Sequence, residues 1–156
     1  MRAYNSLSFP ALQPWHRYVP TELSVAELDA GDWDRYLKAE AAIHDGIRAE
    51  VTQKLEPDAK TPSNRYFEGS PIYPGKFAQD WNRSYVLEPD GKPIGAAVFL
   101  HGLTDTPYSL RHIAKRYRDR GFVTVAPRLP AHGTVPAALT RVEWEDWMAA
   151  PRLAAR

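Results

Sequence analysis

The segment that most constrains the fold is an apolar run that ends abruptly in a His-Gly pair. Residues 94–100 read Ile-Gly-Ala-Ala-Val-Phe-Leu, without polar alternation, and His101-Gly102 follows directly. An apolar run of this length is typical of a strand that is buried on both faces of a mostly parallel sheet. Because glycine lets the backbone turn sharply or approach a ligand closely, a loop is predicted at this point.

The residues after this loop complete a strand–helix–strand unit. Thr106 is suited to cap a helix, and Pro107 to occupy its first position. Apolar residues then recur at helical spacing from 110 to 117, which predicts one apolar stripe on a helix. Gly121 ends this helix, and residues 122–126 read as a second strand. The loop after the first strand therefore lies at the carboxyl edge, where open α/β sheets bind ligands.

Two loops of this unit and the helix after it carry a family resemblance. Residues 101–109 read His-Gly-Leu-Thr-Asp-Thr-Pro-Tyr-Ser, and residues 127–134 read Pro-Arg-Leu-Pro-Ala-His-Gly-Thr. They resemble the His-Gly-Phe-Thr-Gly-Thr-Pro oxyanion loop and the Pro-Arg-Leu-Lys-Gly-His-Gly-Thr segment of α/β-hydrolases. The resemblance is closest to bacterial carboxylesterases and monoacylglycerol lipases, in the serine aminopeptidase-like group. Residues 145–147, Glu-Asp-Trp, resemble a later His-Asp-Trp, so that the similarity covers roughly residues 84–150.

The resemblance implies an α/β fold with an incomplete α/β-hydrolase sheet of three strands. Residues 81–156 would form the N-terminal part of the hydrolase domain, and residues 1–80 a proline-rich, helical extension. On local rules, the Asp-Gly at residues 90–91 favours a hairpin between strands at 84–88 and 94–100. In the family a later strand inserts between these two, and we expect the family arrangement.

The extension is predicted to contain one long helix between irregular segments. Residues 1–20 hold three prolines among aromatic residues and are expected to run extended, and a capping box at residues 24–27 favours a short helical turn. Residues 32–55 form the long amphipathic helix. Its apolar stripe is predicted to consist of Trp33, Leu37, Ala41, His44, Ile47, Val51 and Leu55. Residues 57–79 are predicted to be loop because prolines and glycines interrupt them.

Several single residues of the helices receive structural interpretations. His44 is interpreted as a packing residue, and Gly46 as the mark of a close contact. Glu40 is read as part of a solvated face. Near the C-terminus, a capping box at residues 140–143 predicts another helix, which Pro151 would interrupt.

Ester hydrolysis by this fold requires a serine nucleophile, an acid and a histidine base, in that order along the chain. None of the seven serines lies in a Gly-x-Ser-x-Gly elbow. In the family the elbow follows the helix after the second loop, and the acid and base follow the elbow. The chain is therefore expected to be an α/β-hydrolase by family but inactive on its own. Among the histidines, His101 is expected to orient the oxyanion turn rather than transfer protons, and His112 to face solvent.

The resemblance places the candidate site residues in the two loops. The backbone N–H of Leu103 is the expected oxyanion donor, in an oxyanion loop with His101, Gly102 and Thr104. The loop at the cleft edge contributes His132 and Gly133. No cofactor is expected, and no metal, since no two histidines have i, i+4 spacing with an acid between them.

Composition sets wider bounds on partners and compartment. The formal net charge of +1 gives no argument for nucleic acid, and the absence of cysteine excludes disulfides and thiol chemistry. No apolar run is long enough to span a membrane. The expected partners are a small acyl-ester substrate in the complete protein and a second copy bound through an uncovered sheet edge. The sequence assigns no compartment; a cytoplasmic location is the default expectation, with an upstream anchor or signal left open.

Two functions stay open at this point. The first is the N-terminal part of an esterase- or lipase-like serine hydrolase, with peptidases, acyltransferases and dehalogenases sharing this half of the fold. The second is a non-catalytic module, either truncated or a pseudo-enzyme. A reading frame that continues into a Gly-x-Ser-x-Gly would support the first, and a genuine stop codon after Arg156 the second.

Overall fold

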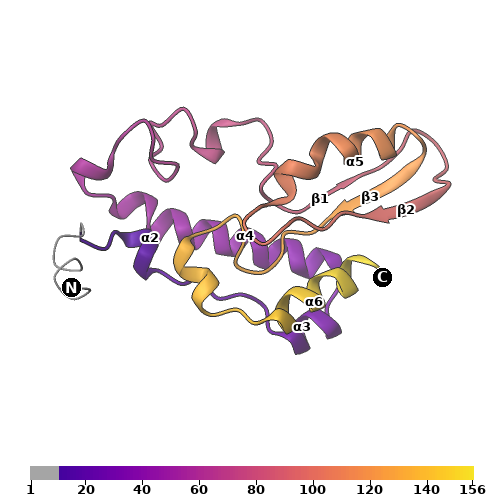
Figure 1. Cartoon of the computed structure of the whole chain (residues 1–156), viewed down its shortest axis with the longest axis horizontal. Helices are drawn as coiled ribbons and strands as arrows, with labels where there is room; N and C mark the ends of the chain where they lie inside the picture. Colours follow the sequence, from indigo (N-terminus) through magenta and orange to yellow (C-terminus); the bar gives the residue numbers. More distant parts are fainter. Residues whose placement is uncertain (1–10) are drawn as a thin grey trace, which may run out of the picture.

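The computed structural model describes residues 11–156, which form a small mixed sheet and a set of helices (Figure 1). The first ten residues of the predicted N-terminal arm lie outside the described part. The α-helices and strands are α2 (Pro14–Arg17), α3 (Val25–Ala30), α4 (Trp33–Glu50), β1 (Tyr85–Leu87), β2 (Gly95–Val98), α5 (Arg111–Arg118), β3 (Phe122–Ala126) and α6 (Trp144–Ala154). Short 3-10 helices lie at Thr52–Lys54, Pro57–Ala59, Pro74–Lys76, Pro107–Leu110 and Pro136–Thr140.

The three strands lie in the order β1-β3-β2. β3 runs parallel to β2, with Phe122 opposite Gly95, and antiparallel to β1, with Ala126 opposite Tyr85. The local hairpin signal at residues 90–91 is therefore wrong, because β3 inserts between β1 and β2. α5 connects β2 to β3 and packs against the sheet (Figure 1), so the predicted strand–helix–strand unit is confirmed.

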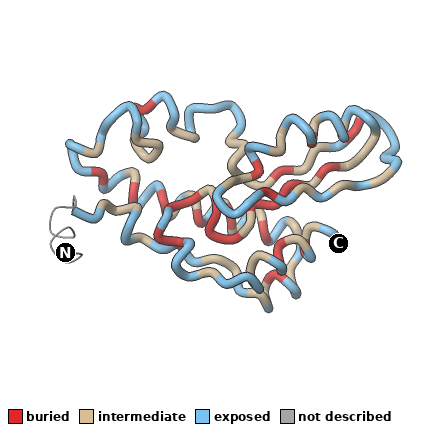
Figure 2. The backbone as a smooth tube through the Cα atoms, viewed as in Figure 1, coloured by how far each residue is buried: buried red, intermediate tan, exposed pale blue. Residues whose placement is uncertain are grey.

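β2 is shorter and more exposed than the sequence predicts. Ile94, Val98 and Leu100 are all exposed, and none of the four residues of β2 is buried (Figure 2). The prediction of a strand buried on both faces is wrong for residues 11–156. β2 is an edge strand: only β3 pairs with it, and no described strand pairs with its outer side.

The N-terminal helices follow the predicted start signals more closely than the predicted ends. Ser24 caps α3 through the expected capping box, and Asp32 caps α4 by accepting a hydrogen bond from the Arg35 N–H (2.8 Å). α4 ends at Glu50 rather than residue 55, and a 3-10 turn follows. α2 contradicts the fully extended path predicted for this segment, since it forms one helical turn. Within residues 11–156, no helix is both long and apolar enough to cross a membrane.

α6 differs from the sequence prediction in two respects: the residue that caps its N-terminus and the effect of Pro151. Glu143, and not Thr140, is its N-cap, and Glu143 forms the capping box with Asp146. The Thr140 hydroxyl instead donates to the Ala137 carbonyl in the preceding 3-10 turn (2.7 Å). Pro151 lies inside α6 rather than interrupting it.

The buried face of α4 lies slightly to one side of the predicted stripe. Its buried residues are Tyr36, Glu40, Ile43 and Ile47, whereas His44 is only partly buried. A cluster between α4 and the loop after β3 forms the middle of the molecule (Figure 2) and contains Ile43, Ile47, Val51, Ala131, Val135 and Ala138. The extension therefore packs directly on the loop that follows β3.

Candidate functional site

The two loops that carry the predicted site residues meet at the carboxyl ends of β2 and β3. Nε2 of His132 lies 2.7 Å from the carbonyl oxygen of Leu103, and Nε2 of His101 accepts a hydrogen bond from the Leu129 N–H (3.0 Å). The two imidazole rings are 5.0 Å apart, centroid to centroid. Residues predicted from two separate sequence segments are thus brought into one cluster.

His101 is buried, and backbone groups occupy both of its ring nitrogens. Because Nε2 accepts from Leu129, the proton of the neutral ring is on Nδ1, which lies 3.0 Å from the Gly102 carbonyl oxygen. Burial lowers the pKa of His101 and so favours this neutral form. With both nitrogens engaged, the ring is suited to hold the turn in place.

His132 is held on the Leu103 peptide by contacts on several sides. Its Nδ1 lies 3.0 Å from the Pro130 carbonyl oxygen, which also accepts a hydrogen bond from the Trp147 indole (3.2 Å). The Trp147 ring packs edge-on against the imidazole, with centroids 5.5 Å apart. The sequence analysis noted Trp147 only as part of the Glu-Asp-Trp resemblance and assigned it no role in the site. In the structure it orients His132.

The loop between His101 and Thr106 is closed by its own backbone. The Asp105 N–H donates to the Gly102 carbonyl (3.1 Å), and the Asp105 carboxylate accepts from the Thr106 N–H (2.7 Å). Hydrogen bonding from Ser109 and then from the Thr106 N–H lowers the pKa of Asp105. The loop is therefore a defined turn, and Thr106, whose hydroxyl accepts from the Tyr108 N–H (3.3 Å), caps the 3-10 helix that follows.

Leu103 and Gly102 form the open side of this turn. The Leu103 side chain is 63% exposed, and within residues 11–156 no hydrogen bond uses its N–H. The predicted turn is present, but Gly102 does not adopt a left-handed conformation, so the turn does not require the conformational freedom of glycine. A Cβ atom added at Gly102 would meet open space. The exposed surface of the turn thus consists of backbone and of the Leu103 and Thr104 side chains.

The loop after β3 is anchored by a buried guanidinium that the sequence analysis did not single out. Arg128 is only 1% exposed, and its two terminal nitrogens donate to the two carboxylate oxygens of Glu22 (2.8 and 2.9 Å). Its Nε donates to Glu40 (3.1 Å). Burial alone would lower the pKa of Arg128, but the carboxylates raise it and keep the group charged.

The same network reaches the cleft loop. Glu22 also accepts from the Ala131 N–H (2.7 Å), and Arg128 also donates to the His132 carbonyl (3.2 Å). Glu40 accepts from the Ser84 N–H through both carboxylate oxygens (3.0 and 3.2 Å). Two carboxylates of the N-terminal extension therefore hold the backbone around His132.

Glu40 corrects an expectation from the sequence. It is 3% exposed, so its assignment to a solvated face is wrong. Placed between Tyr36 and Ile43 at helical spacing, it belongs to the buried stripe of α4, and that spacing is the signal that could have identified it. No comparable local pattern marks Glu22.

The cleft loop also contains two residues in the left-handed backbone region. Ala131 has φ of 67° and Gly133 φ of 69°. Non-glycine residues adopt this region at an energetic penalty, and the motif that this loop resembles has glycine where Ala131 stands. A Cβ atom at Gly133 would lie 3.1 Å from the Asn82 carbonyl oxygen. Gly133 is therefore constrained both by its conformation and by a close neighbour.

The remaining candidate chemistry is limited in the described part of the chain. His112 is exposed on α5, apart from the cluster. Within residues 11–156, no group of three or more His, Cys, Asp or Glu side chains is arranged to hold a metal ion. The serine hydroxyls described there bond to backbone or to non-histidine side chains, including Ser84 with Arg128 and Ser109 with Thr106.

Comparison with known proteins places these loops in context. No family profile matches the chain. Over 57 residues the chain is 39% identical to a thermostable monoacylglycerol lipase of Bacillus sp. (strain H-257), a match that covers 36% of this chain and 22% of the lipase. The α/β-hydrolase-like relationship is therefore shown for part of the chain.

A solved structure described with LipS and LipT, two metagenome-derived lipolytic enzymes, is also similar to this α/β-hydrolase-like chain. It is 33% identical, with a TM-score of 0.40, over 45% of this chain and 27% of the matched structure. The chain thus spans about a quarter of the length of each of these two relatives. Both are named as lipolytic proteins.

Proposed function

We propose that this chain is the N-terminal part of a serine hydrolase that acts on carboxylic esters, and that it contributes the oxyanion loop. In this proposal the Leu103 N–H is one oxyanion donor, and the nucleophile, acid and base come from sequence outside these 156 residues. Residues 81–156 would belong to the hydrolase domain, with its sheet incomplete here, and residues 1–80 would form the extension. A non-catalytic module is the alternative.

The fixed Gly102–Leu103 peptide carries this proposal. The Gly102 carbonyl accepts a hydrogen bond from the Asp105 N–H (3.1 Å) and lies 3.0 Å from Nδ1 of His101, while within residues 11–156 the Leu103 N–H of the same peptide has no acceptor. A donor that is held in place and left unpaired is what stabilisation of a developing oxyanion requires. His101 also ties this turn to the loop after β3, because its Nε2 accepts a hydrogen bond from the Leu129 N–H.

Purified residues 1–156 are expected to hydrolyse no p-nitrophenyl ester above the buffer rate. The reason is that an oxyanion donor without an activated serine cannot form an acyl-enzyme. Hydrolysis is followed by absorbance and covalent labelling by a fluorophosphonate, with a bacterial monoacylglycerol lipase as positive control. Turnover together with stoichiometric labelling would contradict the proposal.

The outer edge of β2 is expected to cause self-association. An unpaired strand edge with exposed Val98 and neighbouring Leu100 is a template for pairing with another chain. Sedimentation velocity should show concentration-dependent dimers or larger species for residues 1–156. Val98→Lys should shift the distribution toward monomer, whereas Leu139→Lys, at an exposed leucine outside the sheet, should not. A monomeric wild-type chain at all concentrations would refute this expectation.

A further inference from the structure

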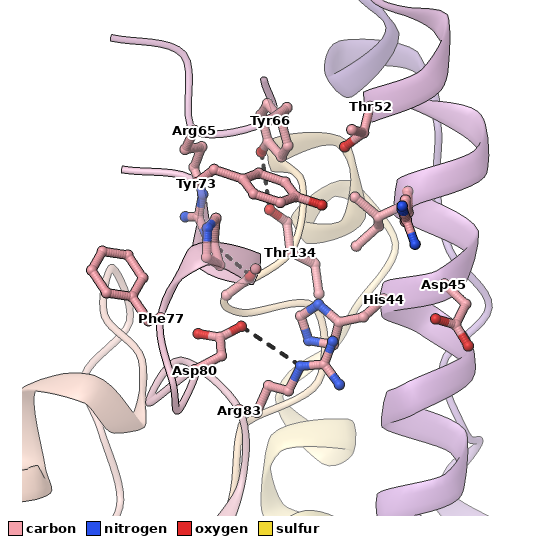
Figure 3. A pocket seen from close by; sticks show the side chains of 15 residues that line it. His44, Asp45, Thr52, Arg65, Tyr66, Tyr73, Phe77, Asp80, Arg83 and Thr134 are labelled. Carbon is pink, nitrogen blue, oxygen red and sulfur yellow. Dashed lines mark hydrogen bonds and ion pairs between the residues drawn. The ribbon is translucent and has the colours of Figure 1, made fainter. Parts of the chain in front are cut away.

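A pocket unrelated to the oxyanion loop lies between α4 and the irregular segment before β1 (Figure 3). Its volume is about 290 Å³, at the lower end of the range for small-molecule sites, roughly 300–1,000 Å³. Residues of α4, of the loops around residues 65 and 75, and of the segment just before β1 line it, together with Gly133 and Thr134 of the loop after β3. Distant parts of the sequence therefore converge on one cavity.

Cationic side chains dominate the polar lining. Arg65 donates to the Gly133 carbonyl (3.3 Å), and within residues 11–156 no carboxylate pairs with it. Arg83 is ion-paired with Asp80 through its buried Nε, which lies 3.6 Å from the Asp80 carboxylate (Figure 3), and within residues 11–156 no hydrogen bond uses its terminal nitrogens. Arg48, the third arginine of the lining, is already paired with Glu68. Arg65 and the terminal nitrogens of Arg83 are thus available to an anion.

His44 adds a further unused polar atom to the same wall. Its Nε2 is buried and has no hydrogen-bond partner in the described chain. Burial, together with the neighbouring Arg83 and Arg128, lowers the pKa of His44 to about 3, although Asp80 opposes this shift. The ring is therefore neutral at pH 7 and can donate from Nε2. A buried polar atom left unpaired is destabilising, which a ligand acceptor would relieve.

The charge and the apolar part of the lining define the class of ligand. Arg48 pairs with Glu68 and Arg83 with Asp80, so within residues 11–156 Arg65 is the lining arginine without a carboxylate partner. One unpaired positive charge matches a monoanion better than a phosphate dianion. The Tyr73 ring reaches into the cavity and Phe77 stands at its side (Figure 3), and the Phe77 side chain is 57% exposed. These rings offer a flat apolar surface to the body of the ligand.

We propose that this pocket binds a small aromatic carboxylate, with its carboxylate held by Arg65, Arg83 and His44 and its ring against Tyr73 and Phe77. The proposal does not depend on ester hydrolysis: no residue of the oxyanion loop lines the pocket, and the cleft-edge loop contributes only Gly133 and Thr134 to its wall. It adds a binding site to the extension and to the segment just before β1, which the hydrolase proposal leaves without a role.

The test is titration of residues 1–156 with benzoate, followed by heteronuclear NMR and by calorimetry. Saturable shifts are expected for the His44 ring and the Arg65 and Arg83 side chains. Arg65→Gln should weaken binding about tenfold or more, because it removes a charge-assisted hydrogen bond. Arg116→Gln, at an exposed arginine of α5, is the matched control and should bind as the wild type does.

Two further ligands make the proposal falsifiable. Benzamide has the same shape without the charge and is expected to bind at least tenfold more weakly than benzoate; equal binding would overturn the carboxylate assignment. Inorganic phosphate is expected to bind more weakly than benzoate, and tighter binding would overturn the monoanion assignment. Circular dichroism of each variant verifies folding, and Arg83→Gln provides a second variant. Absence of saturation by benzoate in the folded wild-type chain would refute the site.

Discussion

Replacing Arg128 by methionine should lower the free energy of unfolding by about 3–5 kcal/mol, because removing one partner of a buried ion pair leaves uncompensated charge. Here two carboxylates lose their counter-charge at once, those of Glu22 and Glu40. Most single domains have only about 5–15 kcal/mol of stability, so the loss would be severe. Urea denaturation at constant m-value measures it.

The pH dependence of this variant has a defined sign. Burial raises the pKa of Glu40, while Arg128 opposes burial by lowering it. Without Arg128 the pKa of Glu40 rises further, so the folded state binds a proton that the unfolded state binds only at lower pH. That contribution to stability is present below the unfolded pKa of Glu40 and is lost as the pH rises through the folded pKa. Arg128→Met should therefore be less damaging in mildly acidic buffer than at pH 8.

A double-mutant cycle with Glu40→Gln provides the control. In the Glu40→Gln background, Arg128→Met should be less destabilising, because one of the two stranded charges is gone. Arg128→Lys keeps the charge but loses the planar fork that reaches Glu22 and Glu40 together, so an intermediate loss is expected. A change below about 1 kcal/mol for Arg128→Met at pH 8 would show that the network contributes little.

Leu103→Pro should reduce ester turnover about 100- to 1,000-fold, roughly 2.7–4 kcal/mol of transition-state stabilisation. This experiment uses a protein in which residues 1–156 continue through the nucleophile, acid and base. Proline has no N–H, so the proposed donor is lost, whereas the carbonyl that lies next to His132 is kept. The measurement is kcat and KM, since loss of a donor used only in the transition state lowers kcat.

Leu103→Ala is the matched control because it keeps the backbone donor. The Leu103 side chain is largely exposed, so this variant should lose little activity or stability. Circular dichroism and substrate binding establish whether the proline variant has kept its turn. If a folded Leu103→Pro protein had a near-normal kcat, the Leu103 N–H would not be the oxyanion donor, and another group would have to supply it.

Local patterns in the sequence predicted elements whose formation depends on residues close together in the chain. The strand at residues 122–126 matches β3 residue for residue, and the insertion of β3 beside β1 followed from the family resemblance. An uncovered sheet edge was expected, but the exposure of the β2 side chains was not, because an apolar run indicates burial only when a neighbouring element covers it. Gly46 illustrates the same limit: a close contact was expected, but only the structure identifies the Tyr18 hydroxyl as the neighbour.

The polar architecture of the site was beyond sequence patterns for a different reason. Arg128 meets Glu22 and Glu40 across 106 and 88 residues of chain, and no periodicity relates positions so far apart. Charged residues on a helix are usually solvated, so Glu40 was assigned to the exposed face. His101 and His132 were identified because a motif marks both, although their mutual contact is visible only in three dimensions.

The origin of the carboxylates that bind Arg128 also bears on how such a chain can be divided or exchanged. Both ion pairs of this arginine are made with residues 1–80, although the arginine itself lies in the segment that we propose to belong to the hydrolase domain. A fragment that begins at residue 81 would retain Arg128 and lose both Glu22 and Glu40. Recombination between relatives at that point would therefore be tolerated only if the incoming segment supplied two equivalent acids, or if Arg128 were replaced at the same time. The extension and the loop that contains Arg128 should therefore be exchanged together, because the carboxylates of one neutralise the charge of the other.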